Sequence, residues 1–159
     1  MYYSITFFKL LAYYIVGDVK MLINYSQSDV DLLARIMRAE ALNEGDLGML
    51  MVGNVVINRA LANCLTFKNI NSISEAIYQK NQFVGTSSSL FQAAATTTEK
   101  RLAERVLRGE YYYPATHSLW FYAPGNNSCT ATWYNQALAG KYKNHCFYRP
   151  DPGECHEIY

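Results

Sequence analysis

The stretch Ser28–Gly45, SDVDLLARIMRAEALNEG, constrains the fold more than any other part of the chain. Leu33, Ile36 and Met37 recur with the period of an α-helix and define one apolar stripe. The serine that opens the stretch, with Asp31 three residues later, has the spacing of a capping box, and the closing glycine is suited to end a helix. The pattern predicts one amphipathic helix with a buried side.

Two glutamates, Glu40 and Glu44, fall near the centre of this apolar stripe, whereas Asp31, Arg35 and Arg38 lie roughly opposite, where solvated charges are expected. A carboxylate among apolar neighbours loses hydration, which favours its protonated form, and this is how a general acid is made. An alternative interpretation places both glutamates in a frayed last turn or pairs them with buried arginines. The helix therefore contributes candidate catalytic residues, with that alternative open.

Composition sets limits on the whole chain. Its 159 residues are enough for one domain with a real core, and half of them are hydrophobic, so a folded globular domain is expected. The formal net charge is +1, which gives no strong electrostatic attraction to nucleic acid or to an anionic membrane. The 14 tyrosines suit uncharged polar ligands such as sugars, although ordinary half-buried packing accounts for most of them.

The first residues form a segment of different character. We expect residues 1–24 to be an N-terminal extension of unknown role and residues 25–159 to form the folded domain. The apolar run Ile5–Val16 is interrupted by Lys9 and is far shorter than the roughly 20 residues needed to span a bilayer. No basic region precedes it and no small-x-small cleavage site follows it, so neither a membrane span nor a signal peptide is predicted.

The remaining elements follow from capping residues, periodicity and turn signals. The polar segment 79–89 and the turn-rich segment 126–143 are expected to be loops. The predicted fold class is α+β, mainly helical, with a small β-containing C-terminal lobe. Its elements after the first helix are a buried helix at 47–61 capped by Asp46, a short helix at 72–78, a long helix at 90–108, and strands at 118–123 and 145–148.

The usual local signatures of enzyme sites are missing from the sequence. It contains no G-x-S-x-G elbow, Walker loop, G-x-G-x-x-G unit, H-E-x-x-H pair or C-x-x-C pair, and no metal site is predicted. A mixed metal site is a weaker alternative; it would draw on His145, Cys146, Cys155 and His156. The cysteines could form disulfides or stay as buried thiols, and the sequence leaves this open for Cys64, Cys129, Cys146 and Cys155.

Carboxylate acid–base chemistry remains, with Glu40 as the best-placed group. A helix-borne glutamate that faces a cleft of Asn, Gln, Tyr and Trp side chains fits glycosidic cleavage, because the acid protonates the leaving oxygen while amides and aromatic rings hold the sugars. Glu44 lies one turn later and would approach the sugar from the same side, so it does not supply the opposed carboxylate of two-carboxylate schemes. We therefore expect Glu44 to be structural.

Six segments carry a resemblance to a known family. In order they are LLARIMRAEALNEG, VGNVVINR, IYQKNQF, LWFYAPG, WYNQ and HCFY. Together they resemble the SleB/CwlJ family of spore cortex-lytic cell-wall hydrolases over about residues 29–156, and the last two, with the cysteine-bearing tail, are most similar to its CwlJ-type branch. The resemblance implies a lysozyme-like or lytic-transglycosylase-like catalytic domain at 25–159 and a substrate of spore-cortex peptidoglycan, degraded during germination.

The resemblance also implies residue roles. Glu40 corresponds to the catalytic glutamate of the family, and Glu44 to the second glutamate of the same motif. The SleB-type branch is associated with lytic transglycosylation, in which the muramic 6-hydroxyl attacks and one glutamate acts as acid and then base; for the CwlJ-type branch a muramidase reaction is also open. Asn58 and Arg59 are expected to hold the Glu40 region together. The substrate-cleft candidates from the matched segments are Gln82, Phe83, Tyr122, Trp133 and His145. The three aromatic residues could instead fill the core, and His145 could instead brace a backbone carbonyl.

Further expectations concern cofactors, partners and location. No cofactor is expected; similarity to the CwlJ-type branch suggests a response to calcium dipicolinate, but no Ca²⁺-loop pattern is present. We expect the protein to be deposited from the mother cell at the boundary of spore coat and cortex, with a coat anchoring protein as a candidate partner. A non-catalytic glycan-binding or coat-assembly protein and a peptidoglycan amidase are the alternatives.

Overall fold

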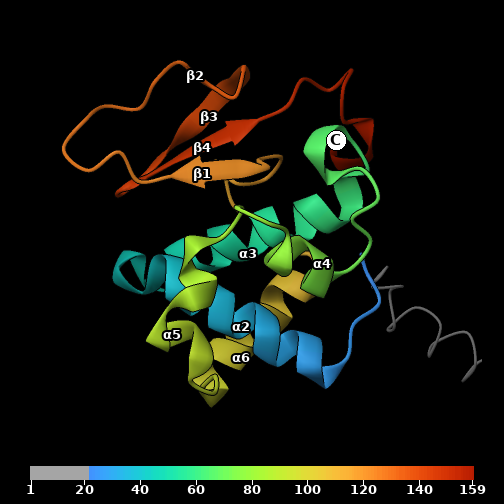
Figure 1. Ribbon diagram of the computed structural model, residues 1–159, viewed down its shortest axis with the longest axis vertical. Coiled ribbons are helices and arrows are strands. Elements are labelled where there is room, and N and C mark those ends of the chain that lie inside the picture. The colour runs from blue at the N-terminus through green and yellow to red at the C-terminus, as the bar shows by residue number, and fades with distance from the viewer. Residues whose placement is uncertain (1–21) are drawn as a thin grey trace, which may run out of the picture.

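The computed structural model describes residues 22–159, so the expected N-terminal extension lies almost wholly outside the described residues. Helices form one layer and a small antiparallel sheet lies across them (Figure 1). Within the described part of the chain, no helix has the length and apolar character that crossing a membrane requires. The elements are α2 (Gln27–Ala41), α3 (Gly45–Ala62), α4 (Ile73–Tyr78), α5 (Ser89–Gln92), α6 (Thr97–Leu107), β1 (Trp120–Tyr122), β2 (Thr132–Trp133), β3 (Gln136–Tyr142) and β4 (His145–Arg149).

The N-cap of helix α2 lies two residues before the predicted cap. Ser26 is the N-cap: its hydroxyl accepts from the Asp29 amide at 3.3 Å, and the Asp29 carboxylate accepts from the Ser26 amide at 2.8 Å. The expected Ser28 cap is therefore wrong, because Ser28 lies inside the helix. The predicted end is also wrong: α2 stops at Ala41, a 3₁₀ turn follows, and Gly45 (φ 76°) opens α3.

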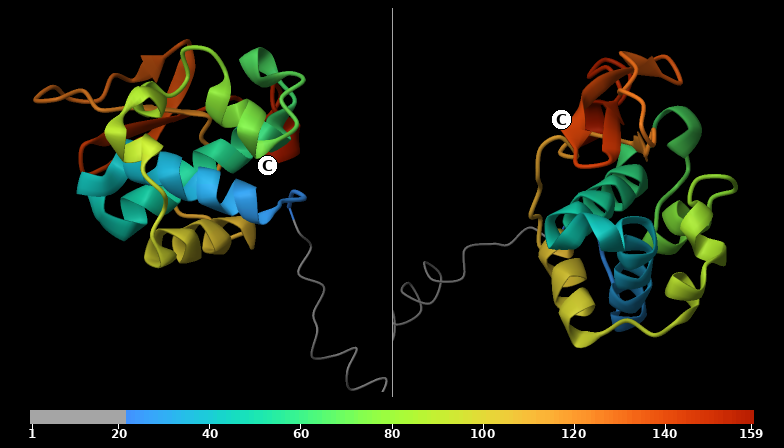
Figure 2. Two further views of the ribbon diagram at one scale, coloured as in Figure 1. Left: turned by 60° about the horizontal axis from the view of Figure 1, so that its bottom comes forward. Right: turned by 90° about the vertical axis from the view of Figure 1, so that its left-hand side faces the viewer.

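The core forms where α2, α3 and α6 meet. The predicted stripe of α2 is buried, with Leu33, Ile36 and Met37 at most 1% exposed. Helix α3 is buried on nearly every side, which confirms the predicted central helix, but it begins at Gly45, so the expected Asp46 cap is wrong because Asp46 lies in its first turn. Helix α6 and the α4–α5 segment flank α2 (Figure 2). A Cβ at Gly53 would lie 2.9 Å from Val106 Cγ2, so glycine allows α6 to pack closely against α3.

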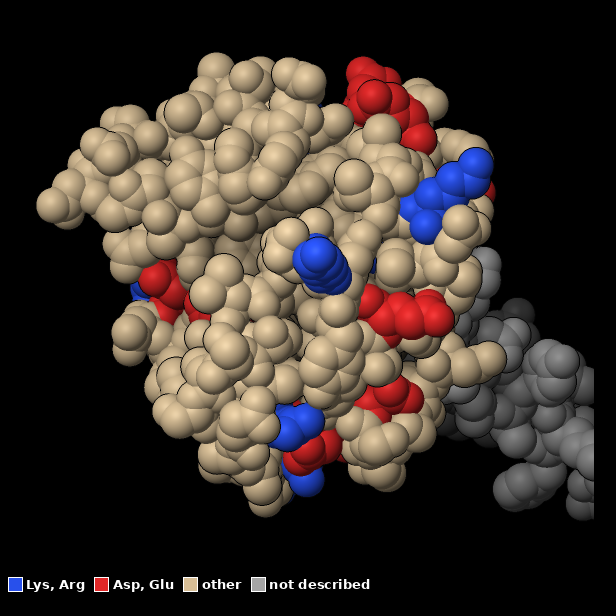
Figure 3. Space-filling view, in the orientation of Figure 1, with Lys and Arg blue, Asp and Glu red and all other residues tan. Residues whose placement is uncertain are grey.

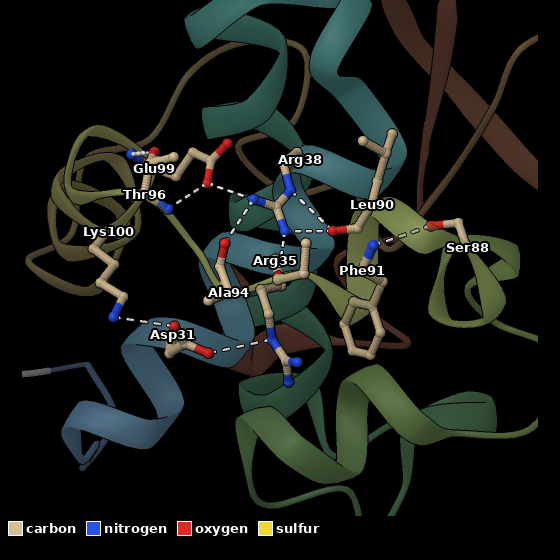
Figure 4. Close-up of polar contacts among 11 residues, drawn as sticks. Asp31, Arg35, Arg38, Ser88, Leu90, Phe91, Ala94, Thr96, Glu99 and Lys100 are labelled. Atoms are coloured by element: carbon tan, nitrogen blue, oxygen red, sulfur yellow. Dashed lines mark hydrogen bonds and ion pairs between the residues drawn. The ribbon is translucent and has the colours of Figure 1, made fainter.

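Arg38 was expected among solvated charges, but only 6% of it is exposed. Its guanidinium donates to the Leu90 carbonyl at 3.0 Å, to the Ala94 carbonyl at 3.1 Å and to the Glu99 carboxylate at 2.9 Å (Figure 4). These bonds satisfy backbone oxygens that have no helical partner and make up for the lost hydration of the arginine. Arg38 thus fastens the connection between α5 and α6 to α2.

The long helix predicted at 90–108 is interrupted. Its first part is only the short α5, and α6 starts afresh after Thr96, which forms a capping box with Glu99. The Thr96 amide donates to the Glu99 carboxylate at 2.7 Å, and the Glu99 amide donates to the Thr96 hydroxyl at 3.2 Å. The T-x-x-E spacing was visible in the sequence and marks the true start of this helix.

The four strands pair in the order β1-β4-β3-β2, with every pair antiparallel. The predicted strands at 118–123 and 145–148 are confirmed as β1 and β4, whereas β3 lies in the segment expected to be turns. Phe147 of β4 packs with Met51 and Val55 of α3, which attaches the sheet to the central helix. The architecture is α+β and mainly helical, as predicted.

Both pairs of cysteines form disulfides. Cys64 bonds to Cys155, which ties the loop after α3 to the C-terminal segment, and Cys129 bonds to Cys146, which ties the loop after β1 to β4. The question that the sequence left open is thereby answered. The alternative mixed metal site is wrong, because Cys146 and Cys155 belong to different disulfides and neither sulfur is a free ligand.

Candidate active site

Glu40 lies in the last turn of α2 and is half-buried. A 3₁₀ turn at Val84–Ser87 lies against it, and the Gly85 amide donates a hydrogen bond of 2.7 Å to Glu40 Oε1. Burial raises the pKa of Glu40 above the ordinary glutamate value, while the bond from Gly85 and the charge of Arg59 act in the opposite direction. The net upward shift keeps more of the carboxyl group protonated, which is what a general acid needs.

Arg59 is the charged group that acts on Glu40 from α3. It is 2% exposed, its Nε donates to the Leu119 carbonyl at 2.8 Å, and its guanidinium lies 4.5 Å from the ring centre of Phe83 and 5.0 Å from that of Phe67. Burial lowers the pKa of Arg59 to about 9, so the side chain stays cationic at neutral pH. Arg59 therefore holds the loop next to Glu40 and supplies a fixed positive charge.

Glu44 has a different environment. It is 4% exposed, and its two carboxylate oxygens accept from the Asn144 side chain at 2.9 Å and from the Asn144 amide at 3.1 Å. Lys143 donates to the Glu44 backbone carbonyl at 2.6 Å. These bonds join the α2–α3 junction to the turn between β3 and β4. They leave Glu44 engaged with the sheet, in keeping with a structural role.

Asn144→Ala is expected to destabilise the fold. The substitution leaves Glu44 Oε1, a buried carboxylate oxygen, without its donor, and a loss of this kind costs about 1–3 kcal/mol. Urea unfolding measures the change, and Asn126→Ala at an exposed turn is the matched control. Equal stability of the two variants would contradict the bracing role.

Asn58 and His145 are both buried among protein groups. Asn58 Nδ2 lies within 3.1 Å of three carbonyl oxygens, those of Ala115, Thr116 and Ser118, so it braces the backbone that leads into β1. His145 is 6% exposed. Its ring packs edge-on against Phe121 at 5.1 Å, and burial lowers its pKa while the charge of Glu44 acts in the opposite direction. Neither side chain is placed on an open surface.

A groove of about 370 Å³ lies beside the α4–α5 loop, the connection that carries Gly85. The face drawn in Figure 3 is hollowed between the sheet above and the helices below, and the sheet there shows no charged side chain. Gln82 is the one predicted cleft residue that lines the groove. The whole lining consists of Leu65, Thr66, Lys80, Asn81, Gln82, Trp120, Tyr134 and Gln136.

The other predicted cleft residues are not part of this lining. Phe83 is 6% exposed and packs beneath Arg59. Tyr122 and Trp133 pack against each other on the sheet, with ring centres 4.6 Å apart, and both contact Tyr148. The prediction missed the other seven lining residues, although five of them lie in the segments IYQKNQF, LWFYAPG and WYNQ: Lys80, Asn81, Trp120, Tyr134 and Gln136.

The groove and Glu40 are connected through one loop. Gln82 lines the groove, and three residues later the Gly85 amide contacts the Glu40 carboxylate. Glu40 itself is not among the lining residues. Over the described range 22–159, no three His, Cys, Asp or Glu side chains come together in an arrangement suited to a metal ion.

Comparison with known sequences identifies the family. The family model described as Cell Wall Hydrolase matches residues 43–148. The matched range begins just after Glu40 and includes Glu44. The cell wall hydrolase CwlJ of Oceanobacillus iheyensis is 47% identical over 138 residues, covering 86% of this chain and 97% of that protein. CwlJ of Bacillus subtilis is 45% identical over 134 residues, covering 84% and 94%.

Comparison with solved structures identifies the fold. The catalytic domain of the Bacillus cereus SleB protein superposes with a TM-score of 0.64 at 22% identity, covering 84% of this chain and 100% of that domain. The catalytic domain of the germination-specific lytic transglycosylase SleB from Bacillus anthracis also gives 0.64, at 21% identity, covering 79% and 98%. The expected fold class is confirmed, and the chain belongs to the Cell Wall Hydrolase family.

Proposed function

We propose that this protein degrades spore-cortex peptidoglycan during germination by cleaving the glycan strand, with Glu40 as its one general acid and base. Membership in the Cell Wall Hydrolase family and the name of the CwlJ relatives support an enzyme that acts on the cell wall, and the name of the SleB domain from Bacillus anthracis supports a role in germination. The observation that carries the proposal is the contrast between the two glutamates. Glu40 has a raised pKa, whereas both carboxylate oxygens of Glu44 are bonded to Asn144.

One carboxyl group is enough for lytic transglycosylation. Protonated Glu40 gives its proton to the glycosidic oxygen as the bond from that oxygen to C1 of muramic acid breaks. The resulting carboxylate then accepts the proton of the muramic 6-hydroxyl, whose oxygen bonds to the same C1, so the anhydro ring closes without water. In a muramidase reaction, water takes the place of the 6-hydroxyl. Both routes avoid the second, opposed carboxylate of the usual glycosidases, and neither calls on a cofactor.

The groove beside the α4–α5 loop is the proposed binding site for the glycan strand. Its volume of about 370 Å³ falls in the usual range for ligand pockets. Tyr134 is 69% exposed and its ring offers a flat face for a sugar ring, while the buried Trp120 adds only a small apolar part of the lining. The amides of Asn81, Gln82 and Gln136 offer donors and acceptors for hydroxyl and acetamido groups. This lining suits a long uncharged polar chain.

Mass spectrometry of the muropeptides released from isolated cortex tests the proposal. Lytic transglycosylation gives anhydro-muramic ends, which are lighter by one water than the reducing muramic ends that a muramidase gives. Either product supports cleavage of the glycan strand and identifies the route. Reducing glucosamine ends, or free peptides with intact strands, would show a different reaction.

The activity is expected to depend on pH through Glu40. Because the acid form donates the proton, the rate falls as pH rises through the raised pKa of Glu40. Because the pKa of Glu40 is higher in the folded than in the unfolded state, protonation of Glu40 raises the free energy of unfolding at low pH. This contribution is lost as pH rises through the pKa of the folded state.

Arg59 variants separate its charge from its packing. Arg59→Met removes a charge that lowers the pKa of Glu40, so the alkaline limb of kcat/KM against pH should move to higher pH. Arg59→Lys keeps the charge and should leave the limb near its wild-type position. A limb that moved to lower pH in Arg59→Met would contradict this assignment of the titrating group.

For location, we propose the boundary of spore coat and cortex, with a coat anchoring protein as a partner. The two disulfides suit an oxidising place outside the cytoplasm, and the likeness to CwlJ proteins motivates the specific site. Immunogold labelling of sectioned spores should mark that boundary, and label confined to the spore core would contradict it.

A further inference from the structure

The contact between Gly85 and Glu40 is unusually restrictive. A Cβ built on Gly85 would lie 2.5 Å from Glu40 Oε1 and 3.0 Å from the Ala39 Cβ, so no side chain fits there without displacing the carboxyl group. The backbone does not demand glycine here, since the positive-φ glycines of the described chain are Gly45, Gly109 and Gly125. The close approach of Glu40 and Ala39, rather than the backbone conformation, therefore favours glycine at position 85.

The direction of this hydrogen bond has a chemical consequence. A backbone N–H can only donate, so Glu40 Oε1 is the acceptor in this bond. Because the carbonyl oxygen of a neutral carboxyl group is a better acceptor than its hydroxyl oxygen, the bond favours the proton on Oε2. We propose that Gly85 is a positioning residue, which holds the acid proton of Glu40 on Oε2 and orients it toward the glycosidic oxygen. The inference rests on the proposed function of Glu40 and adds the residue that orients it.

The turn that carries Gly85 is itself well anchored. The Gly85 carbonyl accepts from the Ser88 amide at 2.9 Å and from the Ser88 hydroxyl at 2.7 Å, and the Thr86 hydroxyl donates to the Phe83 carbonyl at 2.9 Å. Phe83 is buried beneath the Arg59 guanidinium. The amide of Gly85 is thus held by core packing on one side and by turn hydrogen bonds on the other.

Few charged groups other than Glu40 lie close enough to affect the Gly85 amide. The 3₁₀ turn Val84–Ser87 contains no titratable side chain, and Arg59 on α3 is the charged group that acts on Glu40. Glu44, on the turn that follows α2, is bonded to Asn144. A titration seen at the Gly85 amide therefore reports on Glu40.

NMR of the full chain with ¹⁵N-labelled glycine tests the contact without reference to activity. The Gly85 amide proton should move downfield as pH rises through the pKa of Glu40, because the ionised carboxylate is the stronger acceptor. In Glu40→Gln this titration should disappear, while the exposed Gly125 serves as an internal control in both proteins. A Gly85 amide that does not titrate, or that titrates unchanged in Glu40→Gln, would overturn the inference.

Kinetics of Gly85→Ala test its catalytic consequence. The displaced carboxyl group should lower kcat by about 10²-fold while KM changes little. The alkaline limb of kcat against pH should move to higher pH, because the substitution removes a hydrogen bond that lowers the pKa of Glu40. Val84→Ala, in the same turn and at a residue 87% exposed, should keep the wild-type kcat. An unchanged kcat in Gly85→Ala would overturn the positioning role, whereas an inactive wild-type protein with a titrating Gly85 amide would overturn only the proposed function.

Discussion

Glu40→Gln is expected to lower the rate of cortex glycan cleavage by about 10³-fold, the size of effect usual for loss of a general acid. Glutamine keeps the shape of the side chain, and its carbonyl can still accept from the Gly85 amide, but it transfers no proton. Stability at neutral pH should not fall, since the substitution removes a carboxylate whose burial is unfavourable. Release of muropeptides from isolated cortex and thermal unfolding measure the two effects.

Glu44→Gln is the matched control for this experiment. It changes the neighbouring glutamate of the same motif, which bonds to Asn144, so we expect a loss of stability and retention of most of the catalytic rate. Cleavage by Glu40→Gln at the rate of the wild-type protein would contradict the assignment of the acid.

The paired substitution Cys64→Ser with Cys155→Ser is expected to produce the largest loss of stability. This disulfide joins residues 91 positions apart, and releasing a loop of that length is expected to cost about 4–5 kcal/mol. Cys129→Ser with Cys146→Ser, across a separation of 17, should cost about 3 kcal/mol. Urea unfolding of both paired variants, compared with the oxidised wild-type protein, measures the two values.

The order of the two losses matters more than either value. Both disulfides attach segments of the C-terminal part, and Cys155 lies in a segment that has little regular structure of its own. A smaller loss from the Cys64–Cys155 pair than from the Cys129–Cys146 pair would contradict the loop-closure explanation. It would show instead that local packing around β4, rather than loop length, determines the stability that each disulfide contributes.

Features determined within one helix could be predicted from the sequence. The buried face of α2 and the position of Glu40 on it follow from side-chain spacing alone, which is a local property. The helix start was missed by two residues because the sequence contains two S-x-x-D spacings, at Ser26 and Ser28, and only the first forms the capping box. Local signals thus locate an element better than they locate its ends.

Features that depend on distant partners could not be predicted in the same way. Arg38 is buried because acceptors more than fifty positions later in the chain surround it, and Glu44 bonds to Asn144, 100 positions away. Four cysteines allow three pairings, and the sequence does not choose among them. Nothing in the sequence indicates that the Gly85 amide reaches Glu40, which is why this contact was found only in the structure.

The strand β3 shows how tertiary context overrides local preference. Its sequence, QALAGKY, has few of the β-branched residues typical of strands and contains a glycine, so the segment was expected to be turns. It becomes a strand because β4 and β2 flank it on both sides, with a register shift between Leu138 and Gly140. The predicted strands β1 and β4 have the stronger aromatic signal.

Muropeptide mass spectrometry of cortex digested in parallel by the wild-type protein, Glu40→Gln and Glu44→Gln tests most directly whether one carboxyl group cleaves the strand. We expect new muramic ends from the wild-type protein and from Glu44→Gln, and almost none from Glu40→Gln. New ends in equal amount from Glu40→Gln, or their loss only in Glu44→Gln, would contradict the role of Glu40 as the single acid and base.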